Sequence, residues 1–190
     1  MGAGKAVGAG AESGDVVAGE IHVQRGEVGG ITGGKISLSH TNTEDIQAES
    51  VRMIQSAARS VRGEDVSATM SAAFQMDAHD ANLRFAGVGF LEAERAEIGP
   101  GGVYAAMGQE VNLKSCWAKT VLAQDKVQVS QSLVGVAAAR EIEATDVRAG
   151  ILIAKEVRGT VRTLLDTRAA AVFGAAFGAG FAVVWLMRRR

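Results

Sequence analysis

A fifteen-residue repeat of apolar positions constrains this chain more than any other feature of its sequence. Stepping by fifteen from Ile21 gives a series of mostly aliphatic residues as far as Val111, and after one extra residue the series resumes at Val127. A unit this short cannot bury its apolar positions alone, so it must stack on its neighbours. We call this series the first column, and its members are Ile21, Ile36, Val51, Val66, Ala81, Ala96, Val111, Val127, Ile142 and Val157.

Further columns follow the same period. In the turn that begins at Ala81, Leu83 follows two places later and the polar Asn82 lies between them, which is the alternation of a half-buried strand. Five places before the first column comes another apolar residue, such as Met76, and two places after that the residue is always Ala or Gly. A third pair lies five and seven places after the first column, as in Ser71 and Ala73. Three inward pairs per repeat predict an all-β fold, a single-stranded, three-sided β-solenoid with fifteen-residue turns.

The repeat also divides the chain. We expect a flexible Gly/Ala-rich arm over residues 1–15, a β-solenoid of about ten turns over 16–164, and a juxtamembrane segment with a C-terminal anchor over 165–190. The extra residue falls among Gln124, Asp125 and Lys126, where a bulge at a corner would absorb it. Pro100 is expected in an outward loop, where its missing N–H costs least.

Residues 169–187 form an uncharged run, AAAVFGAAFGAGFAVVWLM, that ends against three arginines. As a helix it would reach about 28 Å, close to the thickness of a bilayer core, so we interpret it as a transmembrane anchor rather than a buried Ala-rich helix. Small residues spaced by four, of the kind through which membrane helices approach each other, are expected to allow self-association; they are Ala170, Gly174, Gly178 and Ala182. The sequence shows no secretory signal, which favours a cytoplasmic solenoid, whereas the three terminal arginines favour the opposite orientation.

Aromatic residues outside the anchor lie only between positions 74 and 117 and occupy the outward-leaning part of each turn. One interpretation is that they pack over the corners and widen the core. The other is that they form an interaction patch for a partner or a second rod. The residues are Phe74, Phe85, Phe90, Tyr104 and Trp117.

Little in the sequence indicates catalysis, a metal or a cofactor. The charge balance of 20 basic and 21 acidic residues provides no basic stripe for nucleic acid. The histidines, His22, His40 and His79, occupy different columns. Cys116 falls in a small inward column, and Asp65 and Asp80 stack in adjacent turns without a cleft nearby. We therefore expect no enzyme activity, no cofactor and no metal site.

In architecture the chain resembles the bactofilins, bacterial cytoskeletal β-helix proteins. The resemblance rests on the short-turn solenoid from Val16 to Leu164, with apolar pairs such as Ile46-x-Ala48 and Val51-x-Met53. It implies end-to-end polymerisation and association with membrane, and it transfers no functional residue. The proline-rich ends of that family are absent, and a closing membrane span is not typical of it.

Two functions are consistent with these features. The first is a membrane-anchored structural or scaffold rod that self-assembles, with a cytoskeleton-like or spacer role. The second is a membrane-tethered module that docks a protein partner through the aromatic region 74–117. For self-assembly we also expect an open strand edge at the N-terminal turn, which would pair with a second copy through Ile21 and Val23.

Overall fold

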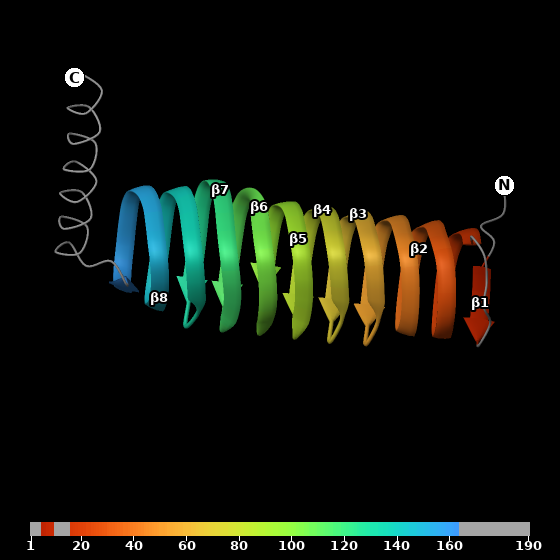
Figure 1. Ribbon diagram of the computed structural model, residues 1–190. Helices are drawn as coiled ribbons and strands as arrows, with labels where there is room; N and C mark the ends of the chain where they lie inside the picture. The colour runs from red at the N-terminus through yellow and green to blue at the C-terminus, as the bar shows by residue number, and fades with distance from the viewer. Residues whose placement is uncertain (1–4, 10–15, 164–190) are drawn as a thin grey trace, which may run out of the picture.

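The computed structural model describes residues 5–9 and 16–163, and over these ranges the chain is a β-solenoid (Figure 1). Eight strands form one parallel sheet in which each strand pairs with the next along the chain. The predicted all-β solenoid is therefore confirmed. The strands are β1 Lys5–Ala9, β2 Val16–Ile54, β3 Ala57–Thr69, β4 Ala72–Arg84, β5 Ala86–Ile98, β6 Gly101–Lys114, β7 Cys116–Ser130 and β8 Leu133–Thr163.

The pairing register reproduces the fifteen-residue repeat. Leu83 of β4 pairs with Ile98 of β5, and both side chains are only 1% exposed. Between β3 and β4 the paired residues fall into three runs, 57–58, 60–63 and 65–69, and one unpaired residue separates each run from the next. These interruptions are corners, so each turn has three short sides around a narrow apolar core.

Backbone proximity explains the column of Ala and Gly residues. A Cβ built on Gly63 would lie 2.9 Å from the carbonyl oxygen of Ala48 in the preceding turn. At Gly108 the corresponding distance, to the oxygen of Ala93, would be 2.2 Å. Successive turns come so close at these two glycines that even a methyl group would require the backbone to shift, and at the other turns of this column the largest residue is alanine.

One corner of each turn adopts a left-handed backbone conformation without glycine. Four residues after the first column φ is positive in nearly every described turn, for example 50° at Met70. Strands β3, β4 and β5 each begin just after such a corner and end just before the next one, so each strand is one turn of the rod. The residues are Arg25, His40, Gln55, Met70, Phe85, Ser115, Gln131 and Asp146.

Pro100 occupies this corner in the turn between Phe85 and Ser115, and its ring excludes a positive φ. In this turn the positive φ is found at the next residue, Gly101, whose φ is +151°. A Cβ on Gly101 would lie 2.2 Å from the carbonyl oxygen of Ala86, so this position requires glycine. Pro100 is thus at a corner of the turn, and the glycine that follows it makes this possible.

The extra residue is accommodated where the sequence predicts it. Gly108 of β6 pairs with Ala123 of β7, but Glu110 pairs with Lys126, so one residue is added at a corner of β7. The same shift appears between β7 and β8, after Leu122. The core continues beyond it, with Val127 and Ile142 fully buried.

The N-terminal end differs from the expected arm. Strand β1 lies within residues 1–15 and pairs in parallel with β2, so that Ala6 faces Ile21 and Gly8 faces Val23. The edge that was expected to pair with a second copy is therefore occupied by this chain's own first strand. Over residues 5–9 and 16–163, no helix is long and apolar enough to cross a membrane. The expected anchor, 169–187, lies outside the described residues.

Candidate interaction surfaces

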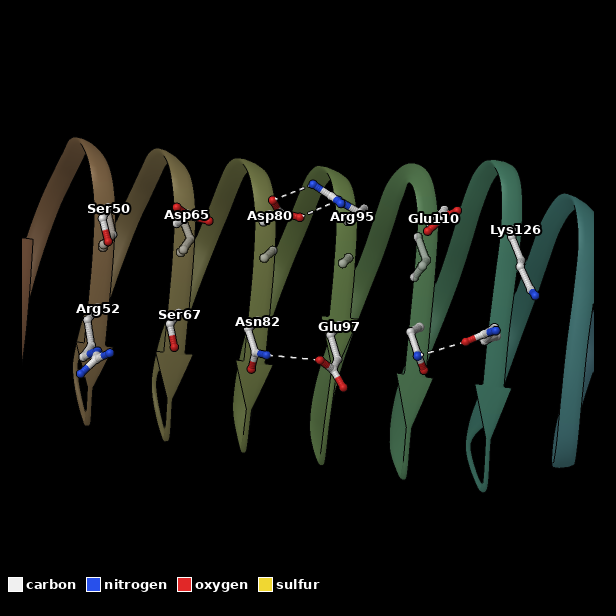
Figure 2. A pocket seen from close by; sticks show the side chains of 17 residues that line it. Ser50, Arg52, Asp65, Ser67, Asp80, Asn82, Arg95, Glu97, Glu110 and Lys126 are labelled. Atoms are coloured by element: carbon white, nitrogen blue, oxygen red, sulfur yellow. Dashed lines mark hydrogen bonds and ion pairs between the residues drawn. The ribbon is translucent and has the colours of Figure 1, made fainter. Parts of the chain in front are cut away.

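A polar groove runs along one side of the rod, over the first column (Figure 2). Its floor is formed by first-column residues such as Ala81 and Ala96, whose side chains are buried in the core while their polar neighbours on either side project outward. One wall includes Asp65, Asp80 and Arg95, and the groove encloses about 660 Å³. The positions on either side of a buried column point outward, so the alternation of the strand creates both walls.

Ion pairs and amide contacts along this groove link successive turns. Arg95 contacts both carboxylate oxygens of Asp80, at 2.8 Å from Nε and 3.0 Å from a terminal nitrogen. Asp65 is the register neighbour of Asp80 on the other side. The prediction that no cleft lies beside Asp65 and Asp80 is wrong, because both residues line the groove. The two carboxylates differ in charge environment, since Arg95 compensates the charge of Asp80 in a bidentate contact.

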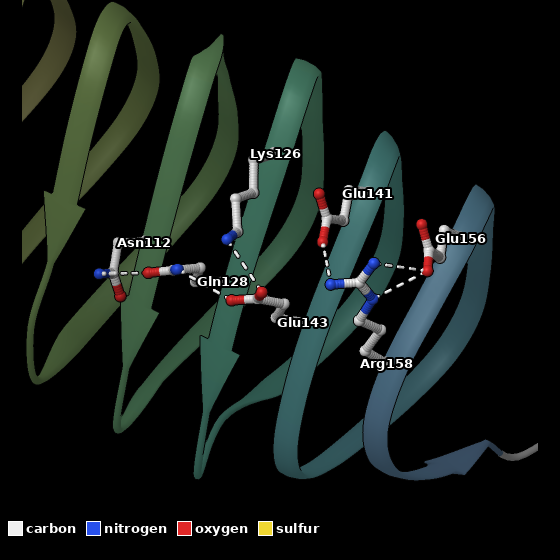
Figure 3. A network of polar contacts seen from close by, with 7 residues as sticks. All are labelled: Asn112, Lys126, Gln128, Glu141, Glu143, Glu156 and Arg158. Carbon is white, nitrogen blue, oxygen red and sulfur yellow. Dashed lines mark hydrogen bonds and ion pairs between the residues drawn. The ribbon is translucent and has the colours of Figure 1, made fainter.

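Further along the rod the same face carries two neighbouring groups of polar contacts (Figure 3). Asn112 donates to Gln128 at 3.2 Å, and Gln128 donates to Glu143 at 2.9 Å. Lys126 donates to Glu143, which lowers the pKa of the Glu143 carboxyl and raises the pKa of the Lys126 ammonium group. Arg158 contacts Glu156 and then Glu141, and these contacts raise the pKa of its guanidinium. Exposed pairs of this kind are worth little individually, and here they tie neighbouring turns together.

Buried hydroxyl groups stabilise the left-handed corners from within. Ser71 Oγ accepts a 3.3 Å hydrogen bond from the Ser56 backbone N–H and donates at 2.8 Å to the Thr69 carbonyl. Ser132 makes the corresponding contacts with Cys116 N–H and with the Ser130 carbonyl. These side chains replace backbone contacts that the corner interrupts, so their role is structural.

Cys116 belongs to this internal column, as the sequence predicts. Its side chain is 5% exposed, and burial raises the pKa of the thiol, which leaves it protonated and inert. The three histidines lie apart on the surface: His22 contacts Glu20, His79 contacts Glu94, and His40 contacts Ser39. Among the described residues, no group of three or more potential ligands is placed to hold a metal ion.

Five aromatic side chains lie on another side of the rod and point outward. Phe85 and Phe74 are the most exposed, at 65% and 62%, and the other three rings are about half exposed. The rings therefore do not widen the core. Phe74, Phe90 and Tyr104 form a row along the rod axis, with edge-to-face contacts between ring centroids at 5.6 and 6.1 Å.

This row follows from a gap at Gly89. The residue shares a corner column with Phe74 and Tyr104, and a Cβ there would lie 2.6 Å from the Phe74 carbonyl oxygen. Since Gly89 has no side chain, the neighbouring Phe90 ring lies between the other two. Lys119 ends the row, because its ammonium lies 4.4 Å from the Tyr104 ring centre and donates to the Tyr104 hydroxyl at 2.7 Å.

We call the side that bears these rings the aromatic face. It comprises the outward residues of the shortest run of each turn, of the two corners beside that run, and of the first position after the second corner, where Phe90 lies. Ala72, Gly87 and Gly102 lie along its middle, and apart from the two chain neighbours no residue has an atom within 4 Å of a Cβ built on Gly87. Its large exposed apolar residues are Met70, Phe74, Phe85, Phe90, Tyr104, Trp117 and Leu133.

The expected site of self-association in the membrane is not covered by the structure. The stripe of Ala170, Gly174, Gly178 and Ala182 lies outside the described residues. Comparison with protein-family models, curated proteins and solved structures gives no match to this chain. The fold defines a β-solenoid repeat protein, and the resemblance to bactofilins stays a prediction.

Proposed function

We propose that this chain is a structural rod held at a membrane by its C-terminal segment, where it acts as a scaffold or spacer. The observation that carries the proposal is the continuous pairing of strands, β1 to β8, in one sheet. Each turn contacts the next through backbone bonds, a buried core and ion-pair ladders, and such a one-dimensional stack suits a spacer of fixed length.

Membrane attachment is part of the proposal and is supported by the sequence of residues 169–187. Deletion of all residues after Thr167 should release the protein from membranes, whereas the full chain should resist a carbonate wash. A matched control replaces the three terminal arginines by serine and leaves the apolar run intact, so this variant should stay with the membrane. Release of the full chain by carbonate would contradict the anchor.

We further propose that the rod lies on the cytoplasmic side and that copies associate through the small residues of the anchor. Gly174→Leu with Gly178→Leu should lower the dimer fraction in detergent, and Val172→Leu should not. Sedimentation equilibrium would measure both. Protease added to intact cells should spare the rod, and digestion before lysis would reverse the assigned side.

Docking through the aromatic region is the second candidate function, and the outward position of its five rings favours it. This role is compatible with a rod, because a scaffold must contact what it positions. Phe85→Ser should then weaken attachment to the docking target, whereas Arg62→Ser on another side should not. Co-purification of the full chain with its target would compare the two variants.

A further inference from the structure

The aromatic face differs from the rest of the rod in charge as well as in apolarity. Six stretches make up this face and its edges from the third turn to the eighth: residues 54–60, 69–75, 84–90, 99–105, 114–120 and 130–136. They contain four basic residues and no acidic residue, although the chain has 21 acidic residues in all. The basic residues are Arg59, Arg84, Lys114 and Lys119.

This acid-free zone has ends. The corresponding stretch one turn earlier, 39–45, contains Glu44 and Asp45, and the stretch one turn later, 145–151, contains Asp146. All five aromatic residues of the described chain lie inside the zone. Aromatic exposure and the exclusion of negative charge thus coincide on one side, over the same turns.

From this coincidence we infer that the aromatic face lies on the surface of an anionic bilayer, so that the rod rests along the membrane. The inference rests on the membrane placement proposed above and specifies which side of the rod faces the lipid. Trp and Tyr favour the interfacial region of a bilayer, and exposed Phe rings can enter its outer hydrocarbon. Arg and Lys attract anionic headgroups, whereas an acidic residue would be repelled.

A second copy of the chain fits this face less well. Two such faces in contact would bring like charges together, because the carboxylates that contact Lys114 and Arg59, Glu97 and Glu44, lie outside the six stretches. Lys119 contacts the Tyr104 hydroxyl, and a second copy brings no acidic residue of this face to it. An anionic lipid surface compensates these positive charges. The middle column of the face has small residues at Ala72 and Gly87, and further along the rod the same column presents the exposed side chains of Trp117 and Leu133.

The end of the described chain lies on the same side. Arg148 belongs to this run, since its backbone N–H donates to the Ser132 carbonyl, and Thr163 follows it by one fifteen-residue period. The described chain thus ends on the side that bears the aromatic rings. A rod lying on this face would bring that end close to the bilayer.

The test uses the full chain with Trp185→Phe, which leaves Trp117 as the only tryptophan. The protein is reconstituted into vesicles of phosphatidylcholine and phosphatidylserine at about three to one. We expect Trp117 emission to move to shorter wavelength, acrylamide quenching to fall about twofold or more, and lipids brominated near the headgroup to quench it. Shielding of Trp117 from acrylamide that is not accompanied by quenching from the brominated lipids would show a protein-covered face and overturn the inference.

Matched variants at one position separate lipid from protein. Gly87 is exposed and has space for a side chain, so Gly87→Glu and Gly87→Lys should both fold, as circular dichroism would confirm. On anionic vesicles Gly87→Glu should return Trp117 to water, and Gly87→Lys should keep it shielded. If both variants lose the shielding of Trp117 equally, the face contacts an apolar protein surface, and the inference is overturned. Gln47→Glu, on another side, controls for the added charge.

Flotation of the same samples distinguishes the two proposals. If the protein floats while Trp117 remains exposed to acrylamide, the lipid-facing side is wrong and the anchor stands. If Gly87→Glu abolishes flotation altogether, the aromatic face holds the protein and the anchor fails. If the unsubstituted full chain does not float, both proposals fail.

Discussion

Ser71 stands one turn beyond Ser56, and its side-chain oxygen accepts the hydrogen bond that the Ser56 backbone N–H donates. Ser71→Ala removes this acceptor and leaves a buried donor without it, which should cost about 1–3 kcal/mol of unfolding free energy. Urea denaturation would measure the loss. Ser60→Ala, outside this buried column, should change stability little, and equal effects of the two substitutions would contradict the structural role of the hydroxyl.

The Pro100–Gly101 corner predicts a conditional effect. Gly101→Ala should destabilise the rod by about 1–3 kcal/mol, because the backbone there is unfavourable for a side chain and Ala86 is too close. Pro100→Asn together with Gly101→Ser should recover much of this loss, since Asn tolerates the left-handed conformation and Ser restores the internal hydroxyl. Thermal melts of the single and double variants would test this, and a double variant no better than Gly101→Ala would refute it.

Thr43 is a position where a substitution should stabilise the rod. Its hydroxyl is buried and has no hydrogen-bond partner, and the equivalent position one turn later is Ala58. Thr43→Val keeps the shape and removes the unsatisfied group, so we expect about 1 kcal/mol of added stability. Thr41→Val is the contrasting control, because the Thr41 hydroxyl donates to the Ser39 carbonyl and that substitution should destabilise. A lower melting temperature for Thr43→Val would contradict this assignment.

The Glu97–Lys114 contact predicts a pH dependence at the acidic end. The Lys114 ammonium lies 2.9 Å from the carboxylate and lowers the pKa of Glu97 below its ordinary value. The unfolded chain therefore binds the proton more readily than the folded chain does. The contact's contribution to the free energy of unfolding is complete above the ordinary carboxyl pKa, and it is lost as the pH falls through the lowered pKa of the folded state. Both groups are largely exposed, so the contribution should be only a few tenths of a kcal/mol.

Melting temperatures of Glu97→Gln, Lys114→Met and the double variant would measure this contribution. Each single substitution should flatten the acidic limb of the stability profile by a similar amount. The double variant should add nothing further, and additive effects would show that the two residues do not interact.

The sequence predicts the repeating core well because burial in a solenoid depends on simple periodicity. Leu83, Ile98 and Cys116 point inward as expected, and the extra residue is added before Lys126. These positions are specified by side-chain size and polarity, which a period of fifteen makes visible in every turn.

The sequence does not predict other features of the fold, because no residue type is specific to them. The left-handed corner holds Arg25, Met70 and Phe85 alike, so its conformation is imposed by stacking rather than by composition. Phe90 belongs to a different column from Phe74, and only the missing side chain at Gly89 lets it join that row. Strand β1 is short and rich in small residues, and its pairing depends on the edge that β2 provides.

The buried hydroxyl groups at the left-handed corners make the two ends of the rod different. Thr41, Ser56 and Cys116 each donate a backbone N–H to a side chain that belongs to the following turn. Removing turns from the C-terminal end would therefore leave such a donor without its side-chain acceptor at the new end of the rod. Removing them from the N-terminal end leaves a hydroxyl that still donates within its own turn, as Ser71 does to Thr69. Each of these turns therefore takes a hydrogen-bond acceptor from the turn that follows it, so the two ends of the rod are chemically unequal.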